Sequence, residues 1–154
     1  MNSYLLRFCF FFLQDNVNLA GFAKLFLEHA DEERAHGKAF IDYLRMRGDA
    51  ETNFIGSAPI TPILNKNEWS SGEEALRDAL AMEKTVSASV RAMIDSCDGD
   101  AGSDYHAADW LVTATLDEQL AGQRKLAGLI NSLSAFRVDH EDLADWMFSN
   151  SLLE

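Results

Sequence analysis

The sequence contains few residues that interrupt helices and few thiols. Its 154 residues include only 2 prolines and 9 glycines, set between long stretches of helix-forming residues. This composition predicts an all-α protein. The two cysteines, Cys9 and Cys97, are too few for a disulfide scaffold or a thiolate zinc site, so they leave the redox compartment open.

Positive charge is also scarce. The 13 Lys and Arg residues are outnumbered by 25 Asp and Glu residues, which gives a formal net charge of −12 and a pI near 4.6. A protein without a basic patch is a poor partner for nucleic acid, so we expect none. An acidic surface attracts cations, although a solvated surface that maintains solubility explains the charge more simply.

Long apolar runs are absent, since no segment approaches the roughly 20 apolar residues that a membrane-spanning helix needs. We therefore expect no membrane association. The apolar segment from Met1 to Leu13 resembles part of a signal peptide, but Arg7 interrupts it and no small-residue cleavage site follows. On this pattern alone, the chain as it stands is predicted to be cytoplasmic.

We expect a single domain over residues 1–154. The predicted segments are a partial first helix at 1–15, a second helix at 19–47, a third at 73–97, a fourth at 104–133 and a short fifth at 141–152. Asn18 is the predicted N-cap of the second helix, and Gly48 is the glycine predicted to follow its last turn.

The connection at 48–72 is unusually long for a compact domain and contains both prolines of the chain. Such length is expected if the chain travels along a bundle and begins the next helix parallel to the previous one. Ser70 and Ser71 stand three residues before Glu73 and Glu74, which is the spacing of a helix-capping box.

Each predicted helix has a stripe of residues at alternating spacings of three and four, as in a packed bundle. The predicted inward stripes are Phe22, Phe26, His29, Glu33, His36, Phe40, Tyr43 and Arg47; then Leu76, Leu80, Glu83, Val86 or Ser87, Val90, Ile94 and Cys97; then Val112, Leu116, Gln119, Gln123, Leu126, Ile130 and Leu133. The short last segment is amphipathic and carries Leu143, Trp146, Met147 and Leu152.

Four polar residues interrupt these apolar stripes near the middle of three helices: Glu33, His36, Glu83 and Gln119. An unpaired carboxylate in a bundle core costs several kcal/mol, so such a group is retained when it is paired or when it binds a metal. A bound metal would account for all four positions together.

Glu33 and His36 are three residues apart, so they project to one side of a helix and can reach the same ion. Oxygen-rich ligation with one imidazole suits iron or manganese. The alternative is structural: His36 is a hydrogen-bonded core histidine, and Glu33 pairs with Arg34 or with a neighbouring helix.

Glu83 and Gln119 also have simpler explanations. Glu83 could form a surface pair with its neighbour Lys84. Gln119 and Gln123 could form a buried polar layer that fixes the register of the bundle.

The predicted helices contain the motifs Asp15-x-Val17, Phe22-Ala23-Lys24-x-Phe26, Glu32-Glu33-Arg34-x-His36, Trp69 with Ala79-Leu80-x-Met82-Glu83-Lys84, Leu116-x-Glu118-Gln119 and Leu143-Ala144-x-Trp146-Met147-Phe148. Together these motifs resemble the helices of the ferritin family. Similarity extends from about Phe12 to the C-terminus, and it is strongest to the heavy-type chain of secreted arthropod ferritins.

The resemblance implies a four-helix bundle with a long crossover loop and a short fifth helix. It also implies assembly with other ferritin subunits into a shell of twenty-four, and oxidation of Fe(II) by dioxygen to a stored ferric mineral. A non-catalytic structural subunit of a mixed shell is the alternative. The subgroup implies a secretory or extracellular location, in contrast to the N-terminal pattern.

The resemblance assigns Glu33 as a bridging carboxylate, His36 and Glu83 as iron ligands, and Gln119 as a hydrogen-bonding group near dioxygen. Further residues assigned through the resemblance are Tyr4, Glu32 and Gln123 around the centre, and His106 and Asp109 at an iron channel.

The first helix departs from the family pattern. Ferritins have a long first helix that supplies another carboxylate ligand and a tyrosine. Here only about a dozen residues precede Asn16, or roughly 20 Å of helix. We interpret the chain as N-terminally truncated, with Tyr4 as the candidate tyrosine and no residue for the missing carboxylate.

Overall fold

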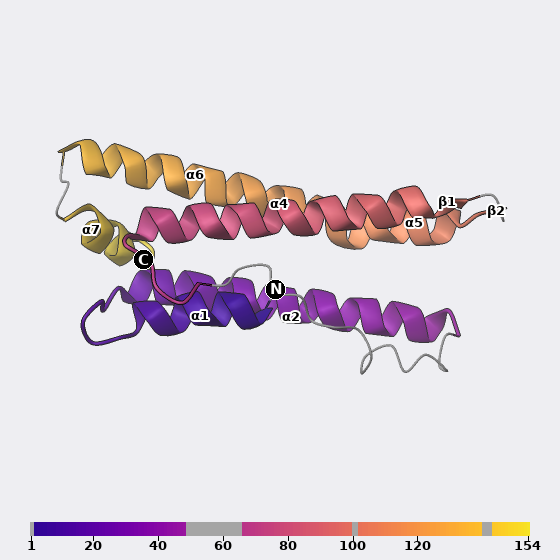
Figure 1. The fold of residues 1–154 in the computed structure, drawn as a ribbon, viewed down its shortest axis with the longest axis horizontal. Helices are drawn as coiled ribbons and strands as arrows, with labels where there is room; N and C mark the ends of the chain where they lie inside the picture. The colour runs from indigo at the N-terminus through magenta and orange to yellow at the C-terminus, as the bar shows by residue number, and fades with distance from the viewer. Residues whose placement is uncertain (1, 49–65, 100–101, 140–142) are drawn as a thin grey trace. The chain divides into compact units, whose positions relative to one another are not determined.

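The computed structural model describes residues 2–48, 66–99, 102–139 and 143–154, and these residues are largely helical. The α-helices are α1 (Asn2–Phe12), α2 (Ala20–Met46), α4 (Gly72–Ser96), α5 (Tyr105–Leu111), α6 (Asp117–Asp139) and α7 (Ala144–Ser151), as Figure 1 shows. A π-helical turn, η1 (Val112–Leu116), lies between α5 and α6. The short strands β1 (Asp98–Gly99) and β2 (Gly102–Ser103) pair antiparallel before α5. The predicted all-α class is confirmed.

The chain divides into two compact units. The first comprises residues 1–68 and 149–154, and the second comprises residues 69–148. The single domain predicted from the sequence stays a prediction, and most of the predicted connection at 48–72 lies outside the described residues. None of the described helices is long and apolar enough to cross a membrane.

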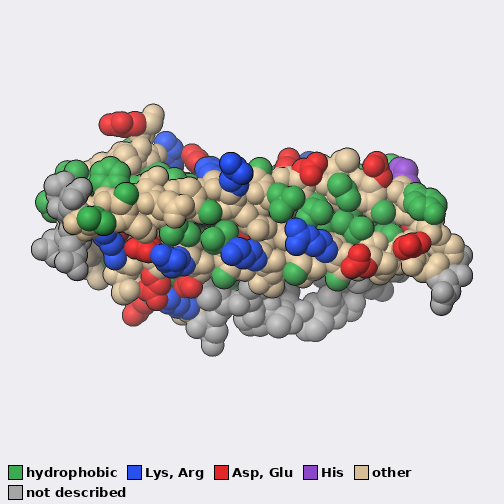
Figure 2. All heavy atoms as spheres, turned by 90° about the horizontal axis from the view of Figure 1, so that it is seen from above, with side chains coloured by type: hydrophobic (Ala, Val, Ile, Leu, Met, Phe, Trp, Pro, Cys, Tyr) green, Lys and Arg blue, Asp and Glu red, His purple; other side chains and the backbone are tan. Residues whose placement is uncertain are grey.

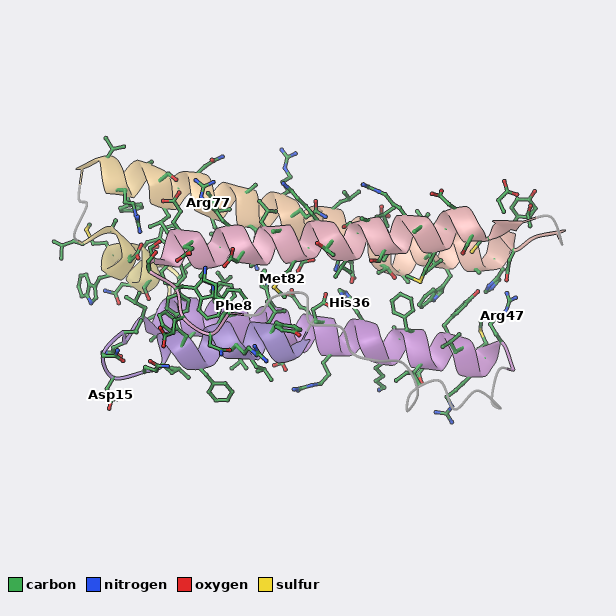
Figure 3. All side chains as sticks on the ribbon, in the orientation of Figure 1. Phe8, Asp15, His36, Arg47, Arg77 and Met82 are labelled. Carbon is green, nitrogen blue, oxygen red and sulfur yellow. The ribbon has the colours of Figure 1, made fainter. Side chains whose placement is uncertain are left out.

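Stacked phenylalanines hold α1 against α2 in the first unit. The ring centroids of Phe8 and Phe26 are 4.6 Å apart, and those of Phe12 lie 5.0 Å from Phe22 and 5.8 Å from Phe26. Phe8 is labelled on α1 in Figure 3. Since α1 has 11 residues and α2 has 27, they are about 16 Å and 40 Å long, and α1 covers only the first part of α2.

The two ends of α2 differ in how well the sequence predicted them. Asn18 is not the N-cap; it takes a left-handed conformation with φ 48°, and Leu19 precedes the helix without a side-chain cap. Asn is among the few residues that tolerate this conformation, which explains its presence there. At the other end Gly48 has φ 84°, so its predicted role after the last turn is confirmed.

The C-terminal residues belong to the first unit and contact the start of α2. The Gly21 N–H donates to Ser149 Oγ at 2.9 Å, and Lys24 Nζ donates to the Leu152 carbonyl at 3.5 Å. Gly21 has no room for a side chain, because an added Cβ would lie 1.7 Å from the Ser149 carbonyl oxygen. This close approach fixes the end of α7 on α2.

In the second unit, the predicted capping of α4 is confirmed. Ser71 is the N-cap, and its Oγ accepts the Glu74 N–H at 3.1 Å. The Glu74 carboxylate in turn accepts the N–H and the hydroxyl of Ser70. Just before the helix, the buried Trp69 donates its Nε1–H to Asp78 at 2.9 Å.

Helices α4 and α6 run antiparallel along each other. Gln123 on α6 contacts Ser87, whereas Ser134, further along α6, contacts Glu73 at the start of α4. α6 extends to Asp139, beyond the predicted end at residue 133, because Arg137 in its last turns is held by two acidic side chains.

Those two acidic side chains connect α6 to α4 and α7. Arg137 Nη2 donates to Asp145 Oδ1 at 2.9 Å, and its Nε lies 3.7 Å from Glu73 Oε2. The other Asp145 oxygen accepts the Gly72 N–H at 2.8 Å. Arg77 also donates to Glu73.

The apolar residues expected on the amphipathic last helix are only partly buried: Met147 and Leu152 are half-buried. Leu143 and Trp146 are 57% and 59% exposed, whereas Ala144, Phe148 and Ser149 are buried. The helix is oriented by the hydrogen bonds of Asp145 and Ser149, which an apolar pattern does not reveal.

Candidate iron-binding residues

The α2 pair of candidate ligands is in contact. His36 Nδ1 and Glu33 Oε1 are 3.1 Å apart, and their side chains are 19% and 12% exposed. A carboxylate only accepts hydrogen bonds, so Nδ1 is the donor, and a neutral ring keeps a lone pair on Nε2. The suggested pairing of Glu33 with Arg34 is not found, since Arg34 pairs with Asp31.

The stripe predicted along α2 is mostly confirmed. Phe22, Phe26 and His29 are buried, and the least exposed residues further along are Glu33, His36, Phe40 and Tyr43. Arg47 was wrongly included, because it is exposed at the end of the helix.

The second pair of candidates lies in the core of the second unit. Glu83 on α4 is 6% exposed and Gln119 on α6 is 3% exposed. The alternative of a surface pair between Glu83 and Lys84 is wrong, because Glu83 is buried while Lys84 is exposed. The polar layer between the helices is formed by Gln123, whose Nε2 donates to Ser87 Oγ at 2.6 Å.

The π-helical turn determines which residues share the inward face with Gln119. Within this turn the Asp117 N–H bonds to the Val112 carbonyl, five residues earlier. One extra residue in a turn rotates the side chains that precede it about the helix axis, relative to those that follow. Leu111 and Thr115 are therefore buried. The predicted inward position Val112 was wrong, because it is exposed, and Leu116 is only half-buried.

Thr115 was not predicted to face inward, and Ser87 was one of two residues predicted for its position. Both are polar and nearly fully buried, at 3% and 2% exposure. The signal that could have found Ser87 is its position four residues after Glu83. No pattern in the sequence marked Thr115, because the π turn is not visible in it.

The remaining candidates are spread over both units. Tyr4 is buried on α1, with Arg7 Cζ 5.0 Å from its ring centre. Glu32 is exposed on α2, and His106 and Asp109 are exposed on α5. Gln123 is half-buried on α6.

The described residues are not gathered into a cluster of three or more metal ligands. Among residues 2–48, 66–99, 102–139 and 143–154, no group of three or more His, Cys, Asp or Glu side chains is placed to hold a metal. Helix α1 contains no Asp or Glu. Cys9 and Cys97 are free thiols, and burial raises the pKa of Cys9.

Comparison with known proteins identifies the family. The protein-family model described as the ferritin-like domain matches residues 1–136 of this chain. The chain belongs to the ferritin family. It is 42% identical to the ferritin heavy chain of Papilio xuthus over 143 residues, covering 92% of this chain and 67% of that one. It is 38% identical to the ferritin heavy chain of Drosophila melanogaster over 142 residues, covering 92% and 69%.

The ferritin fold is confirmed by a solved structure. The crystal structure of Trichoplusia ni secreted ferritin matches with a TM-score of 0.91 and 38% identity, covering 99% of this chain and 80% of that one. The predicted ferritin-like four-helix bundle with a short fifth helix is therefore correct. As a member of this family with heavy-chain relatives, the protein is an iron-storage subunit.

Proposed function

We propose that this ferritin chain oxidises Fe(II) with dioxygen, using Glu33, His36, Glu83 and Gln119 in one centre. The observation that supports it is the burial of these polar side chains: 12% and 19% exposure for the first two, 6% and 3% for the others. Carboxylates are retained in a core where they are paired or where they bind a metal. Carboxylate and imidazole side chains are also ligands that iron accepts.

Each residue has a separate role in this proposal. Glu33 bridges two iron ions, His36 binds one and Glu83 binds the other. Carboxylates are hard donors, and a set of two carboxylates with one neutral imidazole stabilises Fe(III) more than Fe(II), which makes oxidation favourable. Two Fe(II) ions give up one electron each, and dioxygen takes up both electrons and two protons to become hydrogen peroxide. The Gln119 amide hydrogen-bonds to the oxygen species.

The other assigned residues support this chemistry. Tyr4, Glu32 and Gln123 lie around the centre in the proposal, and His106 and Asp109 attract Fe(II) at a channel. The exposure of His106 and Asp109 on α5 is compatible with that role.

A non-catalytic shell subunit is the second candidate. It is favoured by the absence of any carboxylate in α1 and by the absence of a cluster of three ligands among the described residues. In this case the chain contributes to the shell and another subunit oxidises the iron.

Iron oxidation by the purified chain separates the two candidates. We expect saturable formation of Fe(III) absorbance in air, abolished in the double variant Glu33→Ala, His36→Ala. The matched control is Asp31→Ala, Arg34→Ala, a pair with the same spacing and the same 3.1 Å separation but exposed to solvent. Oxidation equal in the parent, both variants and buffer would establish the structural role.

We further propose assembly with other ferritin subunits and a secretory location. Relatives include proteins named as ferritin lower and middle subunits, and the solved relative is a secreted ferritin. Figure 2 shows hydrophobic side chains exposed between charged ones on one face, and the exposed apolar residues of the chain include Val138, Leu143 and Trp146. Native mass spectrometry tests assembly, and expression in insect cells tests release into the medium.

A further inference from the structure

A buried hydroxyl lies one helical turn from Glu83. Ser87 is 2% exposed, and its Oγ accepts the Gln123 Nε2–H at 2.6 Å. Glu83 and Ser87 are four residues apart on α4, so their side chains lie on the same face. Both belong to the core of the second unit.

The Ser87 hydroxyl behaves differently from its neighbours. Thr85 and Ser89, which are exposed, donate their hydroxyl protons to the backbone carbonyls four residues earlier, at 2.9 and 3.1 Å. Ser87 makes no such bond within the described residues; it only accepts from Gln123. A hydroxyl has one proton to donate as well as lone pairs. Its proton is thus available to an acceptor in the core.

We propose that Ser87 is a positioning residue for the Glu83 carboxylate. Gln123 occupies a lone pair of the Ser87 oxygen and leaves the hydroxyl proton to an acceptor on the same face of α4. Ser87 and Glu83 are not hydrogen-bonded in this structure; in the proposal their bond forms when the Glu83 carboxylate turns to bind the metal. This inference rests on the proposed function, in which Glu83 binds iron. A hydrogen bond to a carboxylate is stronger than one between neutral groups, so it holds the ligand in one orientation.

The consequence is greater affinity for the metal. Removing a group that orients a metal ligand typically weakens metal affinity or activity by about 10–100-fold. If the Ser87–Gln123 pair only fixed the register of α4 on α6, its loss would lower stability but leave the affinity of the folded protein unchanged. Metal affinity therefore separates positioning from a purely structural role.

The test is a titration of the full chain with Co(II), followed by its visible absorbance, alongside Fe(II) oxidation at increasing Fe(II) concentration. The variants are Ser87→Ala and Gln123→Leu. The control is Ser89→Ala, the same substitution at an exposed serine of the same helix. Circular dichroism confirms folding of each variant, and Glu83→Ala marks complete loss of this ligand.

We expect Ser87→Ala to weaken Co(II) binding by about 10–100-fold and to raise the half-saturating Fe(II) concentration. Gln123→Leu has the same two effects to a smaller extent, because the Ser87 hydroxyl remains but is no longer oriented. Ser89→Ala binds as the parent does. If Ser87→Ala fails to fold, the weakened binding of folded Gln123→Leu supports the inference, and parental binding by it overturns the inference.

Parental Co(II) affinity in folded Ser87→Ala, with loss in Glu83→Ala, would overturn the positioning role and leave the proposed function intact. Parental affinity in Glu83→Ala itself would overturn both, because Glu83 would then not be a ligand.

Discussion

Gly21 and Ser149 are 128 positions apart in the chain, yet the backbone N–H of one donates to the side-chain oxygen of the other at 2.9 Å. The contact requires the glycine, because an added Cβ would lie 1.7 Å from the Ser149 carbonyl oxygen and 3.1 Å from Leu152 Cβ. The C-terminal residues are therefore fixed to the first turn of α2 by a contact in which backbone approaches backbone.

Substituting Gly21→Ala is expected to detach this C-terminal contact. Overpacking of a buried site typically destabilises by about 1–3 kcal/mol, and here the clash is with backbone, which cannot rotate away. The matched control is Gly37→Ala on the same helix, where nothing lies within 4 Å of an added Cβ. That control should be stabilised by up to about 1 kcal/mol through helix propensity. The melting temperature and the rate of C-terminal proteolysis are measured for both variants. Equal values for Gly21→Ala and Gly37→Ala would contradict the contact.

The packing of α1 on α2 depends on Phe12. Its ring is 1% exposed and stacks on Phe22 and Phe26, so Phe12→Ala should lower the free energy of unfolding by about 3–5 kcal/mol. Phe10→Ala on the same helix is the control, because Phe10 is 68% exposed and its loss should change stability by less than about 0.5 kcal/mol. Denaturant unfolding followed by circular dichroism distinguishes them.

Glu73 should make stability depend on acid pH. The hydrogen bond from Arg77 lowers the pKa of Glu73 below its ordinary value of 4.5, with smaller lowering by Ser134 and Arg137, while desolvation opposes it. A lowered folded-state pKa means that the stabilisation is fully present above the unfolded-state pKa. It is lost as the pH falls through the folded-state pKa, which lies below 4.5.

The variant Glu73→Gln should therefore melt at a lower temperature than the parent at neutral pH, by an amount equivalent to about 1 kcal/mol. The difference should narrow as the pH falls below about 4.5. Glu28→Gln changes the formal charge equally at an exposed site, so its melting temperature should follow that of the parent at every pH. A constant gap for Glu73→Gln down to pH 2 would disprove the pH linkage.

The π-helical turn should tolerate the loss of one residue. Deleting Ala114 reduces the spacing from Leu111 to Gln119 from eight residues to seven, which is two turns of α-helix, so both remain on the inward face. Deleting Ala88 from regular α4 instead rotates the preceding turns by about 100° relative to the rest. We expect the first deletion to shift the melting temperature by a few degrees and the second to prevent cooperative folding. Similar damage from both would argue against the π turn.

The sequence predicted those features that depend on local chemistry. Ser71 caps α4 and Gly48 follows α2 because hydroxyl and glycine suit these positions whatever surrounds them. Asn18 was misassigned because its side chain suits both an N-cap and the left-handed conformation it adopts. The choice between them depends on the path of the chain from α1.

The π turn was missed for a different reason. Leu111 and Val112 are both apolar, so an apolar stripe that begins at either residue is acceptable from the sequence. Only the packing of α5 and α6 against α4 decides between them. The face of α7 was likewise set by hydrogen bonds of Asp145, which an apolar pattern ignores.

The candidate iron ligands were found from the sequence because a polar residue in an apolar stripe is visible without a structure. The contact between two of their neighbours was not predicted. The bond between Ser87 and Gln123 depends on the register of α4 against α6, and no local pattern gives the register of two helices separated by another segment. Whether Glu33, His36, Glu83 and Gln119 act together stays a prediction for the experiments above.

Trp69, the buried indole that donates to Asp78, is an intrinsic fluorescent probe. The chain has 3 tryptophans, Trp69, Trp110 and Trp146, and all fall in the second unit. The phenylalanine-rich first unit contains none. Indole emission therefore reports melting of the second unit alone, while the far-ultraviolet signal reports both. Comparing the two on one sample shows, without any label, whether the units lose their structure in one step or in two.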